Sequence, residues 1–451
     1  MRFFRTEPLL LLIGDLVVFY IALWLTLVVR DMALPGVDRW MDHAVPFTLL
    51  FGISVLIYFI VGLYDRHTSY LRSRLPVLVA YGQIATVVVA ALFFLSTPYF
   101  GITPKTILFI FLAISSVLVV FWRLVLTRFL GVRQRQNALV FGSGEEMEEL
   151  VRELNNNDRY GLSVTHRFEP SAVEVSEQLE KQLLDFIHRK NISTIIIDTR
   201  DPAMARVTPV FYDLLFIHPD LVILDALTLY ENIFRRIPIS MLEHAWFIEH
   251  TTLQTRPLYD LYHRIFDIVM SIPLGVLTLI LFPFVALAIK LEDKGPLFSF
   301  QRRIGRDGLP IDLVKFRTMT LANDDGAWDS VKNEVTRVGA VLRKTRIDEL
   351  PQLWNVLKGG YSLIGPRPEF AEAVAMYRKE IPYYHARHLI TPGLSGWAQL
   401  NHDKHPHHGV DIMETRRKLS YDLYYLKHRS FWLDVEIGLK TIKTLVSAVG
   451  K

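Results

Sequence analysis

The stretch IFDIVMSIPLGVLTLILFPFVALAIK, residues 265–290, decides the fold of this chain. As a helix it is long enough to cross the roughly 30 Å of hydrocarbon in a bilayer, but Pro273 and Pro283 interrupt it. Arg264 precedes the stretch and several Lys and Arg residues follow it, so the preference of these residues for the cytoplasm keeps both ends on one side. We therefore expect a re-entrant helix with its break at Pro283, rather than a kinked span.

Four further apolar stretches precede this segment, at residues 9–29, 46–64, 77–95 and 106–120. Each suits a membrane-spanning helix, and the first is too long, and lacks the small-residue cleavage site, for a signal peptide. Their flanks place nine arginines on one side: Arg2, Arg5, Arg66, Arg72, Arg74, Arg123, Arg128, Arg133 and Arg135. Only Arg30, Arg39 and Lys105 fall on the other side. The pattern predicts a four-helix transmembrane bundle with both ends in the cytoplasm.

The composition agrees with a membrane protein that also carries soluble parts. Of the 451 residues, 51% are hydrophobic, which is high for a wholly soluble chain. There is no cysteine, which excludes disulfides, thiolate nucleophiles and zinc–sulfur sites. A net charge of +4 is too small for this length to indicate nucleic-acid binding.

Between the predicted bundle and the apolar stretch at residues 265–290, short β-rich runs alternate with helical ones. ALVFGSG (138–144), TIIID (194–198) and LVILD (221–225) are the β-rich runs, which predict a Rossmann-like α/β domain. Gly142 and Gly144 stand at a strand-to-helix turn, but the third glycine of the dinucleotide fingerprint is absent and acidic residues follow. A turn that no longer binds dinucleotide and a regulatory nucleotide site both remain open.

Two adjacent carboxylates, Asp348 and Glu349, stand just before an apolar-periodic helix with Pro351 in its first turn. Acidic residues there stabilise a helix by about 0.3–1 kcal/mol through its dipole, so a helix cap is the plain alternative. The basic residues around the pair favour a phosphate site instead, in which Asp348 is a nucleophile or the pair holds Mg²⁺. These basic residues are Arg343, Lys344, Arg346, Arg367, Lys315 and Arg317.

From about Tyr262 to the C-terminus, the chain resembles the bacterial sugar transferase family of polyprenyl-phosphate phosphoglycosyl transferases. The motifs that carry the resemblance are, in order, RIFDI, GPLFSFQRRIGRDG, VKFRTM, RKTRIDELPQLWNVLKGGYSLIGPRPE, TPGLSGWAQLN and YDLYYLKHRS. The whole chain is similar to the long members, undecaprenyl-phosphate glucose- or galactose-phosphate transferases. Their organisation implies three domains: the bundle at 1–136, the Rossmann-like domain at 137–252, and at 253–451 an α-rich monotopic catalytic domain with the re-entrant helix.

The resemblance implies transfer of sugar-1-phosphate from a UDP-sugar to undecaprenyl phosphate, with UMP as the second product and a covalent phosphosugar–aspartate intermediate. It makes Asp348 the nucleophile and Glu349 a Mg²⁺ ligand or positioning acid. The residues that it assigns to substrate phosphate are Arg343, Lys315, Arg317, Arg367 and Arg303. The expected sugar is glucose or galactose, with N-acetylated sugars as an alternative, and the expected reaction is the first step of exopolysaccharide, capsule or O-antigen synthesis. The expected setting is a homodimer in the bacterial inner membrane, with the catalytic domain on the cytoplasmic face among membrane lipid.

Departures from the family pattern are few. Phe282 replaces the serine common before the hairpin proline, Ile347 replaces the usual leucine before the catalytic aspartate, and Glu334 lies in an altered motif and receives no role. The sequence NHDKHPHHG could bind a transition metal, but its proline and glycine favour a solvated loop. Its histidines are His402, His405, His407 and His408.

Two other classes of function fit the sequence less well. A membrane sensor or scaffold would leave the DELPQL and GPRP motifs unexplained. A nucleotide-sugar epimerase or dehydrogenase on a membrane anchor needs an intact glycine fingerprint and a Tyr-x-x-x-Lys pair, and residues 137–245 contain neither.

Overall fold

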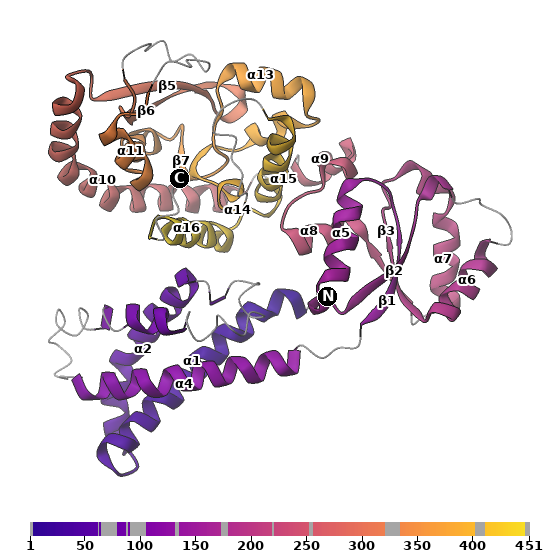
Figure 1. The fold of residues 1–451 in the computed structure, drawn as a ribbon, viewed down its shortest axis with the longest axis horizontal. Coiled ribbons are helices and arrows are strands. Elements are labelled where there is room, and N and C mark those ends of the chain that lie inside the picture. The colour runs from indigo at the N-terminus through magenta and orange to yellow at the C-terminus, as the bar shows by residue number, and fades with distance from the viewer. Residues whose placement is uncertain are drawn as a thin grey trace. The chain divides into compact units, whose positions relative to one another are not determined.

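A computed structural model describes residues 3–61, 63–64, 79–86, 89–90, 105–130, 135–172, 179–218, 221–251, 256–320, 334–401 and 411–446 (Figure 1). The chain forms two compact units, residues 1–134 and 135–451. The predicted division of the second unit near residue 252 stays a prediction. The histidine cluster at 402–408 lies outside the described residues.

The N-terminal unit is built from long apolar helices. Among its described residues, the long helices are α1 (Phe3–Asp31), α2 (Val37–Val61) and α4 (Lys105–Leu130). Residues Leu10–Asp31 and Val37–Val61 are long and apolar enough to cross a membrane, as predicted for the first two spans. The third predicted span is described only in part, at residues 79–86 and 89–90, and on α4 the described apolar part, Ile107–Arg123, is shorter than a full span.

One arginine that the sequence placed among the cytoplasmic flanking charges lies in a buried ion pair of this unit. Arg123 is only 2% exposed and forms a buried ion pair with Asp15 of α1. Tyr64 donates a hydrogen bond to the same carboxylate at 2.8 Å, and Arg123 donates to the Leu63 carbonyl at 2.6 Å. These contacts join α1, α4 and the segment after α2. Removing Arg123 or Asp15 would leave the other charge buried without a partner and would destabilise this packing.

The second unit begins with a parallel four-stranded sheet in the order β2–β1–β3–β4. Its strands are β1 (Gln136–Phe141), β2 (Leu162–Phe168), β3 (Ile192–Ile197) and β4 (Val222–Asp225). Ala138 and Val140 of β1 pack with α5 (Glu145–Asn156) and α8 (Ala226–Phe234), whereas Leu139 and Phe141 pack with α6 (Leu179–Lys190) and α7 (Thr208–Ile217). Alternate residues thus fill the cores on two faces (Figure 1), which confirms the predicted parallel α/β sheet.

The turn between β1 and α5 carries the glycine pair noted in the sequence. Gly144 has a φ of 95°, a conformation that glycine adopts without strain. In the first turn of α5, the Glu146 carboxylate accepts hydrogen bonds from the amide and hydroxyl of Ser240. Arg416 lies 3.6 Å from the same carboxylate. The negative charge of Glu146 at this helix end disfavours binding of a further anion there.

The apolar stretch at residues 265–290 lies in α10 (Pro257–Asp293), a helix of 37 residues. The helix continues through Pro273 and Pro283 as one element. Figure 1 shows that α10 changes direction part-way along, as proline in a helix interior favours. The break predicted at Pro283 stays a prediction. Residues Pro257–Glu292 are apolar enough to cross a membrane, and only 11% of their most apolar window is buried. Re-entry into a bilayer stays a prediction.

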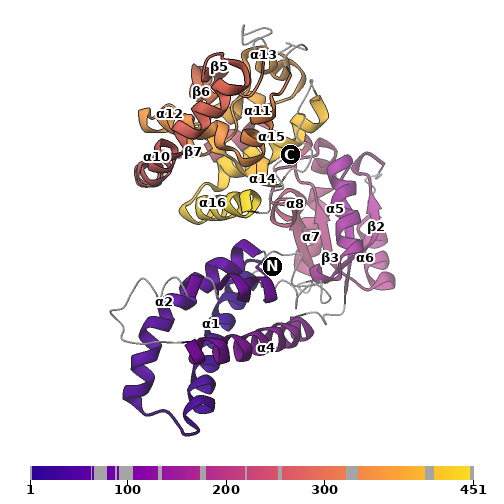
Figure 2. The same cartoon turned by 60° about the vertical axis from the view of Figure 1, so that its left-hand side comes forward.

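The part of the second unit that follows α8 is mainly helical, with two small sheets. Hairpin β5–β6 is antiparallel, and β7 pairs in parallel with β8. Figure 2 shows the hairpin and α13 at one end of this part and α16 at the other. The elements are α9 (His244–Thr251), β5 (Phe298–Ile304), β6 (Pro310–Phe316), α11 (Arg337–Thr345), α12 (Leu353–Lys358), β7 (Ser362–Ile364), α13 (Ala371–Glu380), β8 (Gly393–Ser395), α14 (Trp397–Asn401), α15 (Ile412–His428) and α16 (Phe431–Val446).

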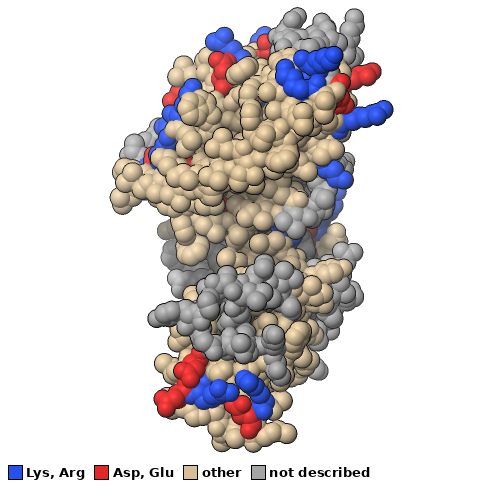
Figure 3. All heavy atoms as spheres, turned by 90° about the vertical axis from the view of Figure 1, so that its left-hand side faces the viewer, with Lys and Arg blue, Asp and Glu red and all other residues tan. Residues whose placement is uncertain are grey.

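An exposed apolar surface accompanies α10. Its exposed side chains include Leu258, Leu279, Phe284 and Leu291, each at least 69% exposed. In Figure 3 the part of the surface that faces the viewer near α10 is largely free of charged residues, which gather toward its rim. An uncharged face of this extent on a long apolar helix is typical of contact with lipid.

Candidate active site

Asp348 and Glu349 lie in a turn of 3-10 helix, η8 (Ile347–Gln352), which leads directly into α12. Helix α11 ends just before it, at Arg346, whose left-handed backbone (φ 59°) redirects the chain. Pro351, expected in the first turn of the following helix, lies inside η8, just before α12 begins at Leu353. Both carboxylates are buried, with Asp348 6% and Glu349 5% exposed.

Glu349 is held by three cations. Its Oε1 atom lies 2.6 Å from an Arg367 nitrogen and 3.1 Å from Lys315 Nζ, and its Oε2 atom lies 3.7 Å from Arg346. Burial alone would raise the pKa of Glu349, but the charges of Arg367 and Lys315 outweigh it and hold that pKa far below its usual range. Glu349 is therefore ionised and fixes the positions of the two cations beside it.

Asp348 has the opposite environment. Its Oδ1 atom is buried and, among the residues that the structure describes, has no hydrogen-bond partner. Burial and the neighbouring charge of Glu349 raise the pKa of Asp348, while Lys315 and Arg343 oppose them. A buried carboxylate oxygen without a partner is costly, so this atom is suited to contact a ligand or a metal ion.

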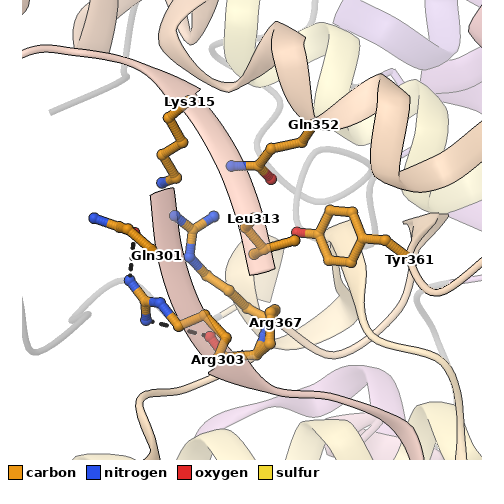
Figure 4. A pocket seen from close by; sticks show the side chains of 8 residues that line it. Gln301, Arg303, Leu313, Lys315, Gln352, Tyr361 and Arg367 are labelled. Carbon is orange, nitrogen blue, oxygen red and sulfur yellow. Dashed lines mark hydrogen bonds between the residues drawn. The ribbon is translucent and has the colours of Figure 1, made fainter. Parts of the chain in front are cut away.

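A small pocket opens beside Glu349, with an empty volume of about 200 Å³. Gln301 pairs with Leu313 across the β5–β6 hairpin, and Arg303 and Lys315 lie two residues further along their strands, so all four side chains share one face. Figure 4 shows their ends, with those of Arg367 and Gln352, gathered around the same space. The full lining is Gln301, Arg303, Leu313, Lys315, Gln352, Tyr361, Arg367 and Pro368.

Arg303 is fixed in this pocket by neutral groups. It donates to the Gln301 amide oxygen at 3.0 Å and to the Pro368 carbonyl at 3.4 Å, and its guanidinium lies 3.5 Å from the Phe370 ring centre. Burial and the charge of Arg367 lower the pKa of Arg303 to about 10. The side chain still carries its charge at neutral pH, so the pocket favours an anion.

The other two arginines that the sequence assigned to phosphate lie outside the pocket lining. Arg343 donates to the Thr318 hydroxyl at 3.0 Å, and its charge acts on Asp348. Arg317 is buried, at 6% exposed, with its backbone amide bonded to the Leu297 carbonyl. The structure thus gathers Lys315, Arg367 and Arg303 around Glu349, with Arg343 on the side of Asp348.

A second buried charge network holds the loop that carries Arg367. Arg387 donates to the Arg367 carbonyl at 2.8 Å and pairs with Asp422 at 2.8 Å. Glu369 lies 3.7 Å from Arg387 and also pairs with Lys418. Because these partners balance one another, the loop keeps one conformation and the Arg367 side chain stays directed at Glu349.

Comparison with known proteins assigns this arrangement to a family. A model described as bacterial sugar transferase matches residues 258–448. A UDP-glucose:undecaprenyl-phosphate glucose-1-phosphate transferase from Caulobacter vibrioides is 39% identical over 195 residues, which cover 43% of this chain and 72% of that protein. This chain belongs to the bacterial sugar transferase family.

Other relatives in the bacterial sugar transferase family are longer than the matched region. A UDP-N-acetylgalactosamine-undecaprenyl-phosphate N-acetylgalactosaminephosphotransferase from Aeromonas hydrophila is 42% identical over 202 residues, covering 44% of this chain and 47% of that protein. A UDP-glucose:undecaprenyl-phosphate glucose-1-phosphate transferase from Escherichia coli is 38% identical over 210 residues, covering 44% and 45%. The chain thus spans about half the length of these two relatives.

Mg²⁺ fits one member of the carboxylate pair better than the other. The unpartnered Oδ1 of Asp348 is available to a metal ion, whereas Glu349 is already bonded to Lys315 and Arg367. No cluster of three or more metal-ligating side chains occurs among the described residues. Mg²⁺ needs only one or two protein carboxylates when substrate phosphate and water complete its shell. The chemistry of the donors therefore suits an ion held chiefly by Asp348 and substrate oxygens.

Several residues of the candidate active site were not identified from the sequence. Gln301, Gln352 and Tyr361 line the pocket, and Arg387 supports Arg367, yet none was selected from the sequence. For Gln352 a signal existed, because it follows Glu349 by three residues and a 3-10 helix places such residues on one face. No spacing rule would have found Arg387, which is 20 residues from Arg367 in sequence.

Proposed function

We propose that this protein transfers a sugar-1-phosphate from a UDP-sugar to undecaprenyl phosphate, producing undecaprenyl-diphosphate-sugar and UMP. The observation that carries the proposal is Asp348, a buried carboxylate with an unpartnered oxygen next to a cationic pocket. The names of the Aeromonas and Escherichia relatives, which describe transfer from UDP-sugars to undecaprenyl phosphate, support it.

The proposed reaction has two displacement steps. An Asp348 carboxylate oxygen attacks the β-phosphorus of the UDP-sugar, and the bond to the oxygen bridging to the α-phosphate breaks, so UMP leaves with the electron pair. The phosphosugar is then an acyl-phosphate on Asp348. An oxygen of undecaprenyl phosphate attacks the same phosphorus, and the Asp348 carboxylate leaves in its original ionised form.

The cations have separate tasks in this reaction. Lys315 and Arg367, held by Glu349, and Arg303 bind phosphate oxygens and offset the negative charge that builds up at phosphorus. Arg343 acts on the side of Asp348, where its charge favours the ionised carboxylate that attacks. Arg317 is assigned to phosphate by the family motif alone.

Mg²⁺ is part of the proposal. Asp348 would hold it together with phosphate oxygens, with Glu349 as a further ligand only if its ion pairs with Lys315 and Arg367 open. When bound, Mg²⁺ would withdraw charge from the phosphate oxygens.

The proposed location is the bacterial inner membrane, with the catalytic part on the cytoplasmic face. Helices long and apolar enough to span support a membrane protein, and a re-entrant α10 would keep Asp348 on the side where UDP-sugars are made. There the site meets both a soluble donor and a lipid phosphate at the membrane surface. We further propose a homodimer, which the mass of the purified protein in detergent would test.

The sugar is proposed as a hexose, glucose or galactose. Relatives with glucose in their names favour glucose, and the 42% identical Aeromonas relative makes N-acetylgalactosamine a specific competitor. The product would begin exopolysaccharide, capsule or O-antigen synthesis.

A UMP-release assay tests the function. Membranes containing the protein are mixed with undecaprenyl phosphate and, in turn, UDP-glucose, UDP-galactose and UDP-N-acetylgalactosamine, with and without Mg²⁺. We expect UMP from one sugar above the others, and none from Asp348→Asn. Asp312→Asn removes an exposed carboxylate from the same hairpin and should keep wild-type activity. Full activity of Asp348→Asn would remove the nucleophile assignment.

A further inference from the structure

The side chain of Gln352 has no assigned role, although it lies at the centre of the pocket. Gln352 is the last residue of η8, is 2% exposed and lines the pocket with Lys315 and Arg367. Figure 4 shows its amide pointing toward the ends of these two cations. Within the described parts of the chain, no group hydrogen-bonds this amide. An amide in the pocket wall that no protein group bonds is free to donate to a bound molecule, which indicates a binding group rather than a packing one.

The charges around Gln352 indicate what it binds. Lys315 and Arg367 share one carboxylate, Glu349, and Arg303 pairs with no carboxylate among the described residues. These three cations outnumber the two carboxylates beside them, Glu349 and Asp348, so the pocket keeps an excess of positive charge. A phosphate group would balance this excess and offers several acceptor oxygens at once.

The local helix explains why Gln352 faces this space. In a 3-10 helix, residues three apart lie on the same face, so Gln352 stands below Glu349 and on its side of η8. It therefore approaches the pocket from the same element that carries Asp348. A group bound there would be close to both the carboxylate pair and the cations of the hairpin.

We propose that Gln352 is a substrate-binding residue whose amide N–H donates to a phosphate oxygen held by Lys315 and Arg367. This inference rests on the proposed function and adds a neutral donor to its cations. The phosphate belongs either to the nucleotide-sugar or to the lipid acceptor, and the two half-reactions separate these sources. Loss of a hydrogen bond to a charged group weakens binding by about tenfold to a hundredfold.

Two variants of Gln352 test the proposal. Gln352→Met keeps the length of the side chain and removes the donor, and should slow the affected half-reaction by about tenfold to a hundredfold. Gln352→Glu adds a negative charge beside Lys315 and Arg367, so the folded protein should keep or raise its thermal midpoint while phosphate binding falls further. If Gln352 had only a structural role, Gln352→Glu would instead lower the thermal midpoint. The folded fraction of that variant would then turn over at a near-normal rate. Gln182→Glu makes the same substitution on the exposed surface of α6 and should change neither quantity.

The half-reactions are measured one at a time. UMP released from the UDP-sugar without lipid reports the donor step, and lipid-dependent transfer from the preloaded enzyme reports the acceptor step. Slowing of the first places the contact on the nucleotide-sugar phosphate, and slowing of the second alone places it on the lipid phosphate. Wild-type rates for Gln352→Met and Gln352→Glu in both steps would overturn this inference. Absence of UMP release from the wild-type protein would instead overturn the proposed function.

Discussion

Asp348 and Glu349 are neighbours in the chain, yet their surroundings shift their pKa values in opposite directions. Glu349 is surrounded by cations that keep it ionised. Asp348 combines burial with the adjacent negative charge and retains an oxygen with no partner among the described residues. Paired carboxylates in divergent environments take different roles. We therefore propose that Glu349 positions the cations and that Asp348 carries the chemistry.

Replacement of Glu349 by glutamine tests this division. The amide keeps the size of the side chain but removes the charge that Lys315 and Arg367 share. We expect the free energy of unfolding to fall by about 1–3 kcal/mol, and UMP release to fall about tenfold or more as the cations lose their positions. Thermal unfolding in detergent and the UMP assay measure the two effects. Glu372→Gln, on the exposed surface of α13, is the control, and a variant at 349 matching it in both measurements would contradict the assignment.

His388 predicts a loss of stability in mild acid. Burial, with the charges of Arg387 and Arg378, lowers the pKa of His388 to about 3, below the 6.5 of an exposed histidine. Between these values the unfolded chain binds a proton that the folded chain does not, so stability falls as the pH drops below 6.5. The slope approaches about 1.4 kcal/mol per pH unit.

Unfolding midpoints at pH 7 and pH 5 measure this effect. His388→Gln should show a smaller decrease between the two pH values than the wild-type protein. His385→Gln, an exposed neighbour, should behave like the wild type. Equal decreases in all three proteins would show that His388 does not control the acid response.

Among single residues, the sequence identified those whose residue type and motif indicate a role in catalysis or phosphate binding. Lys315, Arg367 and Arg303 do surround Glu349, although the motifs alone gave no distances. Arg123 was interpreted as a cytoplasmic flanking charge, but the structure buries it against Asp15, 108 residues away in the sequence. Such a pair depends on the packing of two helices, which the local sequence does not contain.

At the scale of elements, α10 is bonded to both helices that flank the carboxylate pair. Near its amino end, Arg264 donates to the Val356 and Leu357 carbonyls at the end of α12, each at 2.5 Å. Near its carboxyl end, Glu292 accepts from the Arg337 and Val338 amides that begin α11. A cation at a helix C-terminus and an anion at an N-terminus both oppose the local dipole charge. The apolar helix therefore positions the polar site.

Removal of the Arg264 charge tests this coupling. Arg264→Gln leaves the last carbonyls of α12 without their cation, which should cost about 0.3–2 kcal/mol of stability. UMP release should also fall, since α12 continues directly from the turn that holds Asp348. Arg152→Gln removes an exposed charge from the interior of α5 and serves as the control. Unchanged activity and unfolding midpoint in Arg264→Gln would show that α10 does not support the site.

Elements with strong periodicity or long apolar runs were predictable, and those with mixed composition were not. The parallel strands β1, β3 and β4 coincide with apolar runs in the sequence. β2, LSVTHRF, has no such run and was not predicted, because an edge strand needs fewer buried residues. Likewise α10 begins at Pro257, well before its apolar stretch, since polar residues of its first turns face the catalytic part.

At the scale of the whole molecule, the length of α10 bears on topology. Its 37 residues would extend about 55 Å as a straight helix, far more than the roughly 30 Å of hydrocarbon in a bilayer. A single crossing would leave much of an apolar, exposed helix outside the membrane. The change of direction in α10 offers another solution, in which the helix enters the bilayer and both of its ends stay on one face.

Labelling of single cysteines decides between these topologies, because the natural chain contains no cysteine. Asp260→Cys and Lys294→Cys place thiols at exposed positions near the two ends of α10, and Leu34→Cys places one in the exposed connection between α1 and α2. In right-side-out vesicles, a membrane-impermeant maleimide should label only Leu34→Cys, and in inside-out vesicles only the other two. Retained UMP release would show that each variant is folded. Labelling of Asp260→Cys and Lys294→Cys from opposite faces would make α10 a crossing helix and place Asp348 on the other side of the membrane from the N-terminal end of that helix.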